Sequence, residues 1–180
     1  HLTPDTFSGI ITSPPYLNRD SYIAQYKLEL FLMEFIRNHK EYRDLTKATI
    51  RSHVEAEYVS INPMVSDEIS YLVEEIEKRG VNNPKIPGMI VGYFDDMNIV
   101  LSNLSKCLAV GGKIALVVGN SAWSGVLIEA DKLLSTIAAS HGLTIENIYV
   151  TRYKLNSAQQ IKKYGKIPIR ESVIIASKET

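Results

Sequence analysis

The stretch Phe7-Ser8-Gly9-Ile10-Ile11-Thr12-Ser13-Pro14-Pro15-Tyr16 decides the fold expected for this chain. The apolar residues up to Ile11 predict a short buried strand, and the segment after Ile11 is too rigid for an ordinary turn. Two consecutive prolines fix φ at about −65° and remove two backbone donors, which leaves nearby carbonyl groups free to bind a ligand. Ser13 adds a hydroxyl group, and Tyr16 adds a flat ring with a polar tip. These residues suit a planar group that carries an exocyclic amine, such as a nucleobase.

The tetrapeptide Ser13-Pro14-Pro15-Tyr16 resembles the catalytic motif of DNA amino-methyltransferases, which reads (Asp/Asn/Ser)-Pro-Pro-(Tyr/Phe/Trp). Later stretches of the chain are similar to members of that family over most of its length: 17–22, 26–31, 91–97 and 108–120. In this family S-adenosylmethionine supplies a methyl group to the exocyclic nitrogen of adenine or cytosine, and the target base is flipped out of the helix. The resemblance therefore implies a DNA methyltransferase of the restriction-modification or stand-alone type, with double-stranded DNA as its partner.

The resemblance also implies roles for the motif residues. An exocyclic amine is a poor nucleophile because it is conjugated with its ring, so acceptors must draw the nitrogen toward tetrahedral geometry. Ser13 Oγ and the Pro14 carbonyl are the expected acceptors, next to Pro15 in the rigid loop, and Tyr16 is the expected stacking platform. Thr12, Ser13 and Pro14 are expected to supply part of the cofactor contacts. In the family, Ser in the first position favours N4 of cytosine, whereas Asp or Asn favours N6 of adenine.

Other functions stay open at this point. A Pro-rich loop or a partner-binding motif can have the same tetrapeptide. Relatives with Asp-Pro-Pro-Tyr or Asn-Pro-Pro-Tyr modify RNA or protein, so an RNA or protein amino-methyltransferase is an alternative, as is an N6-adenine enzyme. A non-catalytic fragment or subunit that retains the motif but has no cofactor site is a third possibility.

The family's Gly-rich cofactor loop has no counterpart in the sequence. The glycines Gly92, Gly111-Gly112, Gly119 and Gly125 do not form that pattern, and Gly111-Gly112 is expected to end a helix before a strand. We therefore expect residues 1–180 to form the catalytic half of a methyltransferase domain, with a helical insertion at about 40–90. The cofactor-binding half is then expected upstream in the same enzyme.

The pattern of strands and helices predicts an α/β fold. The resemblance implies that this fold is the C-terminal half of a Rossmann-like seven-stranded methyltransferase sheet. That sheet would be mostly parallel with an antiparallel last strand. By resemblance, the strand order runs from the catalytic strand to the Gly-Gly strand, then the last strand, then the strand at 144–152 on the edge. The unpaired edge of the catalytic strand favours a homodimer. The expected elements are strands at 7–12, 113–119, 144–152 and 171–177, and helices at 21–39, 67–80, 93–108 and 126–140.

Composition sets wider limits on the kind of protein. The chain has 180 residues, 45% of them hydrophobic, and a formal net charge of zero. It can bury a core, but any nucleic acid must be bound by local basic patches. Cys107 is the only cysteine, which excludes an internal disulfide, and it is expected to be buried. No apolar run reaches membrane-spanning length, so we expect a cytoplasmic protein that does not bind a membrane.

Two basic stretches are candidates for DNA contact. The segment 153–170 is expected to be a loop without acidic residues, and its cations are Lys154, Lys162, Lys163, Lys166 and Arg170. Asn18, which comes just after the catalytic motif, is a further candidate. The second stretch, 37–53, contains interleaved acidic residues and is better interpreted as a solvated helix face. His39, His53 and His141 have no partners at metal-ligand spacing and are expected on the surface.

Polar residues come after the Gly-Gly strand, at the sheet edge where ligands bind in Rossmann-like folds. Asn120, Ser121 and Trp123 could line or close the base pocket. Alternatively, Ser121 or Ser124 caps the next helix, although capping does not explain the indole of Trp123. Asp95 and Asp96 are expected in the first turn of a helix, where the helix dipole favours them.

Overall fold

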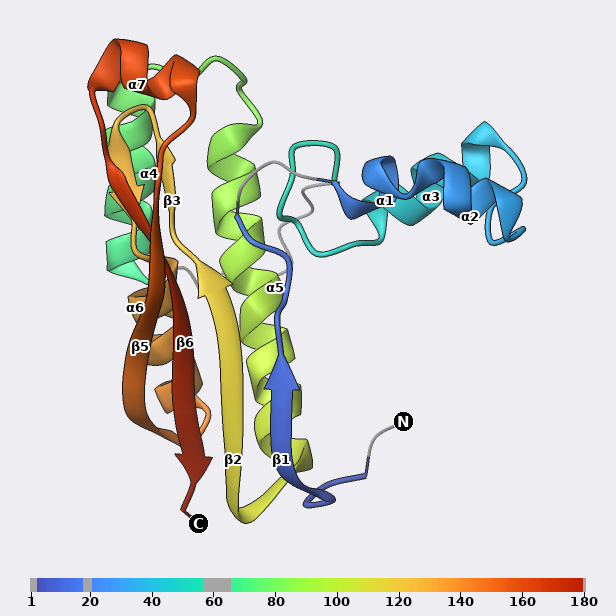
Figure 1. Ribbon diagram of the computed structural model, residues 1–180, viewed down its shortest axis with the longest axis vertical. Coiled ribbons are helices and arrows are strands. Elements are labelled where there is room, and N and C mark those ends of the chain that lie inside the picture. Colours follow the sequence, from blue (N-terminus) through green and yellow to red (C-terminus); the bar gives the residue numbers. More distant parts are fainter. Residues whose placement is uncertain (1–2, 18–20, 57–65, 180) are drawn as a thin grey trace.

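A four-stranded sheet forms the centre of the protein (Figure 1). The structure, a computed structural model, describes residues 3–17, 21–56 and 66–179. The strand order is β1-β2-β6-β5, with bounds Phe7–Thr12, Leu108–Gly119, Pro168–Lys178 and Leu143–Leu155. This is the order expected from the sequence. Only β1 and β2 are parallel, so the described sheet is mixed rather than mostly parallel, and the seven-stranded sheet remains a prediction.

The hydrophobic core lies between the sheet and two helices, α5 (Ile86–Cys107) and α6 (Ala130–Ser140). Along β2 the side chains of Ile114, Leu116 and Val118 are buried in alternation, which is the period of a strand with one face on the core. α4 (Asp67–Lys78) packs against α5 and begins after its cap Ser66, whose hydroxyl accepts from the Ile69 amide. The helix expected at 67–80 is thus confirmed, and Cys107 is buried as expected.

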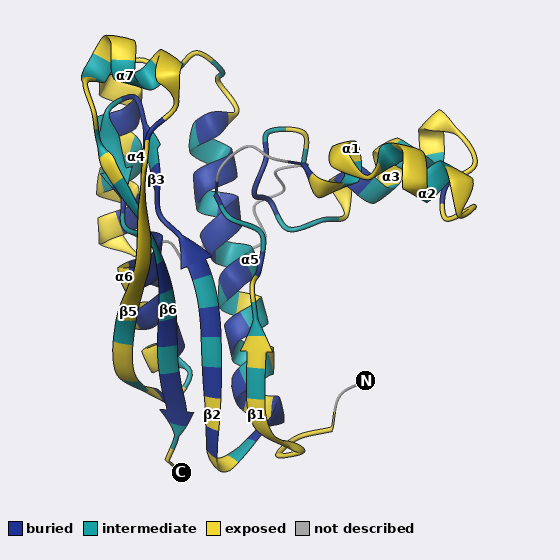
Figure 2. Cartoon of the chain, in the orientation of Figure 1, coloured by how far each residue is buried: buried dark blue, intermediate teal, exposed yellow. Residues whose placement is uncertain are grey.

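The opposite face of the sheet is apolar but open. Ile11, Ala115 and Ile175 are aligned across β1, β2 and β6, and the Ile11 side chain is 86% exposed (Figure 2). The expectation that 7–11 forms a buried strand is therefore wrong for the described chain, because β1 is an edge strand and α5 and α6 pack on the other face.

An arm of short helices extends from the side of the body (Figure 1). It contains α1 (Tyr22–Gln25), α2 (Lys27–Leu32) and α3 (His39–Lys47), so the single helix expected at 21–39 is wrong. Glu34 adopts a φ of 58°, which interrupts the helix, and Asn38 then starts α3 by accepting from the amides of Lys40 and Glu41. Tyr26 and Met33 of this arm are mostly exposed.

The junction of the arm with the body differs from what the sequence predicts for Arg51, His53 and the pair Asp95-Asp96. Arg51 and His53, expected on a solvated surface, are buried, with exposed fractions of 7% and 3%. Asp95 and Asp96 lie well inside α5 rather than in a first turn, and their carboxylates face Arg51. α5 begins at Ile86 instead of residue 93, so Asp95 and Asp96 lie in its interior. Their carboxylates bind Arg51 there and join the arm to the body.

Further corrections concern element boundaries. Gly111-Gly112 lies within β2 and does not end a helix, because α5 ends before it at Cys107. Val126–Ile128 forms β4, which pairs with β3 (Ser121–Trp123), so the helix expected from 126 starts only at Ala130. The expected loop at 153–170 contains α7 (Ala158–Tyr164). Among the described residues, no helix has the length and hydropathy needed to cross a bilayer.

Candidate functional site

The Ser13-Pro14-Pro15-Tyr16 segment lies at the carboxyl ends of the two parallel strands. Thr12, half-buried, is aligned with Leu116, and the segment continues along the end of β2. Pro14 is buried and Pro15 half-buried, whereas Ser13 is exposed. The rigid prolines therefore fix the loop and leave the serine hydroxyl group accessible.

The Tyr16 ring packs directly against Gly119, the last residue of β2. A Cβ atom at position 119 would lie 2.7 Å from Tyr16 Cδ2 and 3.0 Å from Cε2. Contacts this short are not tolerated between carbon atoms, so the ring occupies the space of a missing side chain.

A cleft of about 560 Å³ opens beside this contact. A cavity of this size is within the range of small-ligand sites. Of the candidates from the sequence, Tyr16, Trp123, Lys154, Lys163 and Arg170 line the cleft, together with Asn120 and Ser121. Thr12, Ser13, Pro14, Pro15, Lys162 and Lys166 are not in its lining, and Asn18 lies outside the described residues.

Arg170 lines the cleft, and we call Arg170 with its partners Asp131 and Ser172 the floor of the cleft. The buried carboxylate of Asp131 holds these side chains together. Arg170 donates to it from Nε at 2.6 Å and from Nη2 at 3.1 Å, and Ser172 donates from Oγ at 2.7 Å. Burial alone would raise the pKa of Asp131, but the hydrogen bonds from Arg170 and Ser172 outweigh it, and the pKa lies below its usual value. The guanidinium of Arg170, a predicted DNA contact, is also held by Glu129 at 3.2 Å.

Asn120 connects this floor to the end of β2. Its backbone N–H donates to the Arg170 carbonyl at 3.0 Å, and its side-chain Oδ1 accepts from the backbone N–H of Asp131 at 3.1 Å. This side chain therefore supplies the polar cap at the start of α6. Ser121 and Ser124 were the alternative capping candidates, and neither caps the helix: Ser121 Oγ accepts from Trp123 Nε1, and Ser124 Oγ donates to the Gly80 carbonyl.

One wall of the cleft contains a carboxylate between two cations. Lys154 Nζ lies 2.8 Å from Glu171 Oε2, and Arg152 Nη2 lies 2.9 Å from Glu171 Oε1. Burial acts to raise the pKa of Glu171, and these two donors more than offset it, so that the pKa is lowered. Glu171 holds the Lys154 ammonium group in place, but its single charge is shared with Arg152, so the three side chains together keep one net positive charge.

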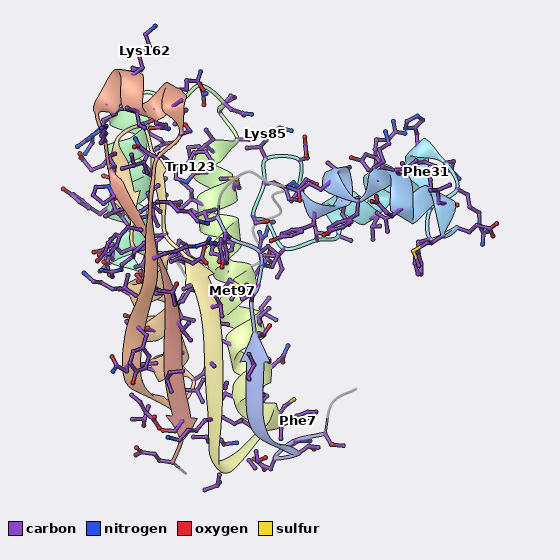
Figure 3. All side chains as sticks on the ribbon, viewed as in Figure 1. Phe7, Phe31, Lys85, Met97, Trp123 and Lys162 are labelled. Atoms are coloured by element: carbon purple, nitrogen blue, oxygen red, sulfur yellow. The ribbon has the colours of Figure 1, made fainter. Side chains whose placement is uncertain are left out.

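α7 forms the opposite wall and is attached to the β3–β4 turn. The Tyr164 ring lies against Gly125, where a Cβ atom would be 2.8 Å from Tyr164 Cδ1, and Gln160 Oε1 accepts from the Gly125 amide. Asn156 joins the two ends of the α7 segment through hydrogen bonds with Gly165 and Ile167. Lys162, Lys163 and Lys166 are exposed on this segment, and Lys162 projects away from the sheet (Figure 3).

Sequence reasoning did not identify several residues that build the cleft, among them Asp131, Glu171 and Tyr164. The local pattern gives no indication of Asp131, which looks like an ordinary acidic residue in the first turn of a helix. Its partner Arg170 is 39 residues away, so only the fold brings them together.

The chain is similar to curated Type II methyltransferases. Type II methyltransferase M.BsoBI of Geobacillus stearothermophilus is 31% identical over 98% of this chain and 39% of its own length. Type II methyltransferase M.AvaI of Nostoc sp. is 32% identical over 95% of this chain and 38% of its own length. The chain thus spans less than two fifths of these relatives.

No protein-family model matches the chain. A crystal structure of a candidate DNA modification methylase from Thermus thermophilus covers 49% of this chain and 37% of that chain at 18% identity. Its TM-score of 0.38 is too low to establish a shared fold.

Proposed function

We propose that this chain is the catalytic part of a DNA methyltransferase that transfers a methyl group from S-adenosylmethionine to the exocyclic amine of a flipped base. The observation that carries the proposal is the position of Ser13-Pro14-Pro15-Tyr16 at the carboxyl ends of β1 and β2, with Tyr16 lining an open cleft. Similarity to Type II methyltransferases along nearly the whole chain supports it. Cytosine N4 is the favoured target because Ser13 stands first in the motif.

In this proposal the exposed hydroxyl oxygen of Ser13 accepts a hydrogen bond from one amine N–H, and the Pro14 carbonyl accepts from the other. Both acceptors favour a pyramidal nitrogen whose lone pair attacks. When bound, the cofactor would supply an electrophilic methyl group: as the new N–C bond forms, the C–S bond of the sulfonium would break, S-adenosylhomocysteine would leave with the electron pair, and the proton lost by the nitrogen would pass to solvent. The Tyr16 ring would stack on the extruded base, which offsets part of the cost of removing it from the duplex.

The fit of the chain to the cofactor is partial. Thr12, Ser13 and Pro14 lie at the carboxyl end of an edge strand, where they can form one side of a methyl-donor pocket. We propose that a cofactor-binding half packs against the free edge of β1 and the open apolar face around Ile11, Ala115 and Ile175. The exposure of Ile11 supports a partner surface here, since isolated apolar faces of this kind are seldom left in water. A homodimer through the same edge is the alternative.

For DNA, we propose that the exposed lysines of the α7 segment contact phosphates beside the cleft. Lys162 and Lys166 support this because they are exposed and lie on the segment that forms a wall of the cleft. Lys154 and Arg170 are weaker candidates, since carboxylates already bind them.

Methyl transfer by the full-length protein to plasmid DNA tests the proposal. Digestion to nucleosides and mass spectrometry should give N4-methylcytosine. Ser13→Ala removes a preorganised acceptor and should lower the rate about 10²–10³-fold. Ser8→Ala is the matched control, since Ser8 is an exposed serine of the same strand that lies before the motif.

The other outcomes of this experiment separate the alternatives. N6-methyladenine as the only product would support the adenine enzyme, and transfer to RNA or protein but not to DNA would support those substrates. No transfer to any substrate, with no effect of Ser13→Ala on any binding, would favour a non-catalytic subunit. A Ser13→Ala rate equal to the wild-type rate would reject the role given to Ser13.

A further inference from the structure

We propose that Gly119 is a positioning residue for Tyr16: the absence of a side chain at 119 lets the Tyr16 ring pack closely against the end of β2 and form part of the cleft lining. The inference deepens the proposed function and rests on it for its effect on catalysis. The contact itself can be tested without any reaction.

The geometry of the contact shows why a side chain is excluded. A Cβ atom on Gly119 would lie 2.7, 3.0 and 3.2 Å from Tyr16 Cδ2, Cε2 and Cγ. The third of these atoms is the one through which the ring joins its own chain, so a small tilt of the ring edge does not remove the overlap. The whole ring must move.

The strand cannot move in its place. Gly119 is paired with Glu171 of β6, and the next residue is held by a hydrogen bond from its amide to the Arg170 carbonyl at 3.0 Å. The Asn120 side chain also accepts from the Asp131 amide at the start of α6. A side chain at 119 would therefore displace Tyr16 and leave β2 in place.

The backbone of Tyr16 is fixed on both sides. Pro14 is buried, Pro15 has a restricted φ, and the Leu17 side chain is completely buried in the core. The ring can then respond to a larger residue at 119 only by rotating about its side-chain bonds. Because Tyr16 lines the cleft, this rotation changes the surface that a planar ligand would stack on.

Gly119→Ala isolates this contact from backbone effects. Gly119 is not among the glycines with positive φ, so alanine can adopt its conformation. Gly125, with a φ of 79°, would be strained by any side chain and is unsuitable as a control. Two matched controls exist in the same strand pair. Gly9→Ala meets only ordinary contact, at 3.9 Å from the Lys113 carbonyl, and Gly112→Ala clashes with the Ala109 carbonyl at 2.8 Å, away from Tyr16.

The first arm of the experiment observes the ring directly. The full-length protein is labelled with 3-fluorotyrosine, and the fluorine signal of Tyr16 is assigned by its loss in Tyr16→Phe. Gly119→Ala should shift this signal, whereas Gly9→Ala and Gly112→Ala should leave it unchanged. An unchanged Tyr16 signal in Gly119→Ala would overturn the proposal.

The second arm measures methyl transfer to plasmid DNA in a double-mutant cycle. Loss of base–aromatic stacking lowers binding about fivefold or more, so Tyr16→Ala and Gly119→Ala should each reduce kcat/KM by at least about that factor. In the Tyr16→Ala background, Gly119→Ala should cause no further loss. The same loss with and without the ring would mean that Gly119 does not act through Tyr16.

Two further outcomes keep the inference and the proposed function apart. If Gly119→Ala fails to fold, the Tyr16→Ala/Gly119→Ala double variant should recover the melting temperature of Tyr16→Ala, and a double variant that stays unfolded would overturn the inference. If the wild-type protein transfers no methyl group to DNA, the proposed function fails, and the fluorine signals alone decide whether Gly119 positions Tyr16.

Discussion

Arg51 and Asp96, 45 residues apart, are joined by three hydrogen bonds that attach the helical arm to α5. The Arg51 amide donates to Asp96 Oδ2 at 2.8 Å, Nε donates to the same oxygen at 3.0 Å, and Nη2 donates to Oδ1 at 2.7 Å. The Arg51 side chain also packs against Gly92, where a Cβ atom would lie 2.7 Å from Arg51 Cδ. A bidentate pair at a buried position fixes orientation as well as distance.

Asp96→Asn should therefore destabilise the protein. The substitution keeps the volume of the side chain but leaves the buried guanidinium of Arg51 with an incomplete set of acceptors. We expect the free energy of unfolding to fall by about 3 kcal/mol in urea denaturation. Asp44→Asn is the control, because Asp44 pairs with Lys40 at 2.7 Å on the open surface, where solvent screens the pair, and it should have little effect on stability. Equal effects of the two variants would contradict this role for Asp96.

Asp131→Asn should lower the free energy of unfolding by a similar amount, about 3 kcal/mol, since Arg170 and Ser172 both lose an ionised acceptor. Because the folded-state pKa of Asp131 is lowered, its contribution is present above the unfolded value of about 3.9 and is lost as the pH falls through the folded-state pKa. Chemical denaturation at several pH values should show the difference between wild type and variant shrinking below about pH 4. Glu146→Gln, at the exposed pair with Lys113, is the control and should have a small effect.

His53 should make the stability depend on pH near neutrality. Burial lowers its pKa in the folded state, against the opposing charge of Glu55, whose Oε2 lies 3.6 Å from Nδ1. The unfolded chain then takes up a proton at a higher pH, near about 6.5, so stability decreases as the pH falls below this value and levels off below the folded-state pKa. His53→Gln should reduce this slope in melting temperatures measured from pH 8 to 5. The exposed His39→Gln is the control, and an unchanged slope in His53→Gln would exclude His53 as its source.

Lys162→Ala and Lys166→Ala should each weaken DNA binding in a salt-dependent way. If each lysine contacts one phosphate, the slope of log K against log salt concentration should become less steep by about 0.9 per substitution, with no change in sequence preference. Fluorescence anisotropy with a labelled duplex at several salt concentrations measures this slope. Lys113→Ala, in the middle of β2, outside the cleft lining and paired with Glu146, should leave it unchanged. A slope that stays the same in all three variants would argue against the α7 segment as a phosphate contact.

Elements with local signals could be predicted from the order of residues alone. The apolar run before Ser13-Pro14-Pro15-Tyr16 predicted β1, helical spacing predicted α4, and resemblance to a known family implied the strand order of the sheet. These features depend on neighbours within a few residues or on a motif that is read directly. For the same reason the rigid loop could be recognised as a candidate site before its surroundings were known.

The tertiary structure decided the features that depend on residues far apart in the chain. Glu34 breaks the helix expected at 21–39 although the apolar spacing continues through it, because periodicity does not report a positive φ. Arg170 looks like a DNA contact in the sequence and becomes a partner of Asp131 because β6 lies beside the start of α6. Gly119 reads as one of several scattered glycines, and only the parallel pairing of β1 with β2 brings Tyr16 against it. The physical reason is that burial and charge pairing depend on neighbours in space, and the order of residues along the chain does not specify them.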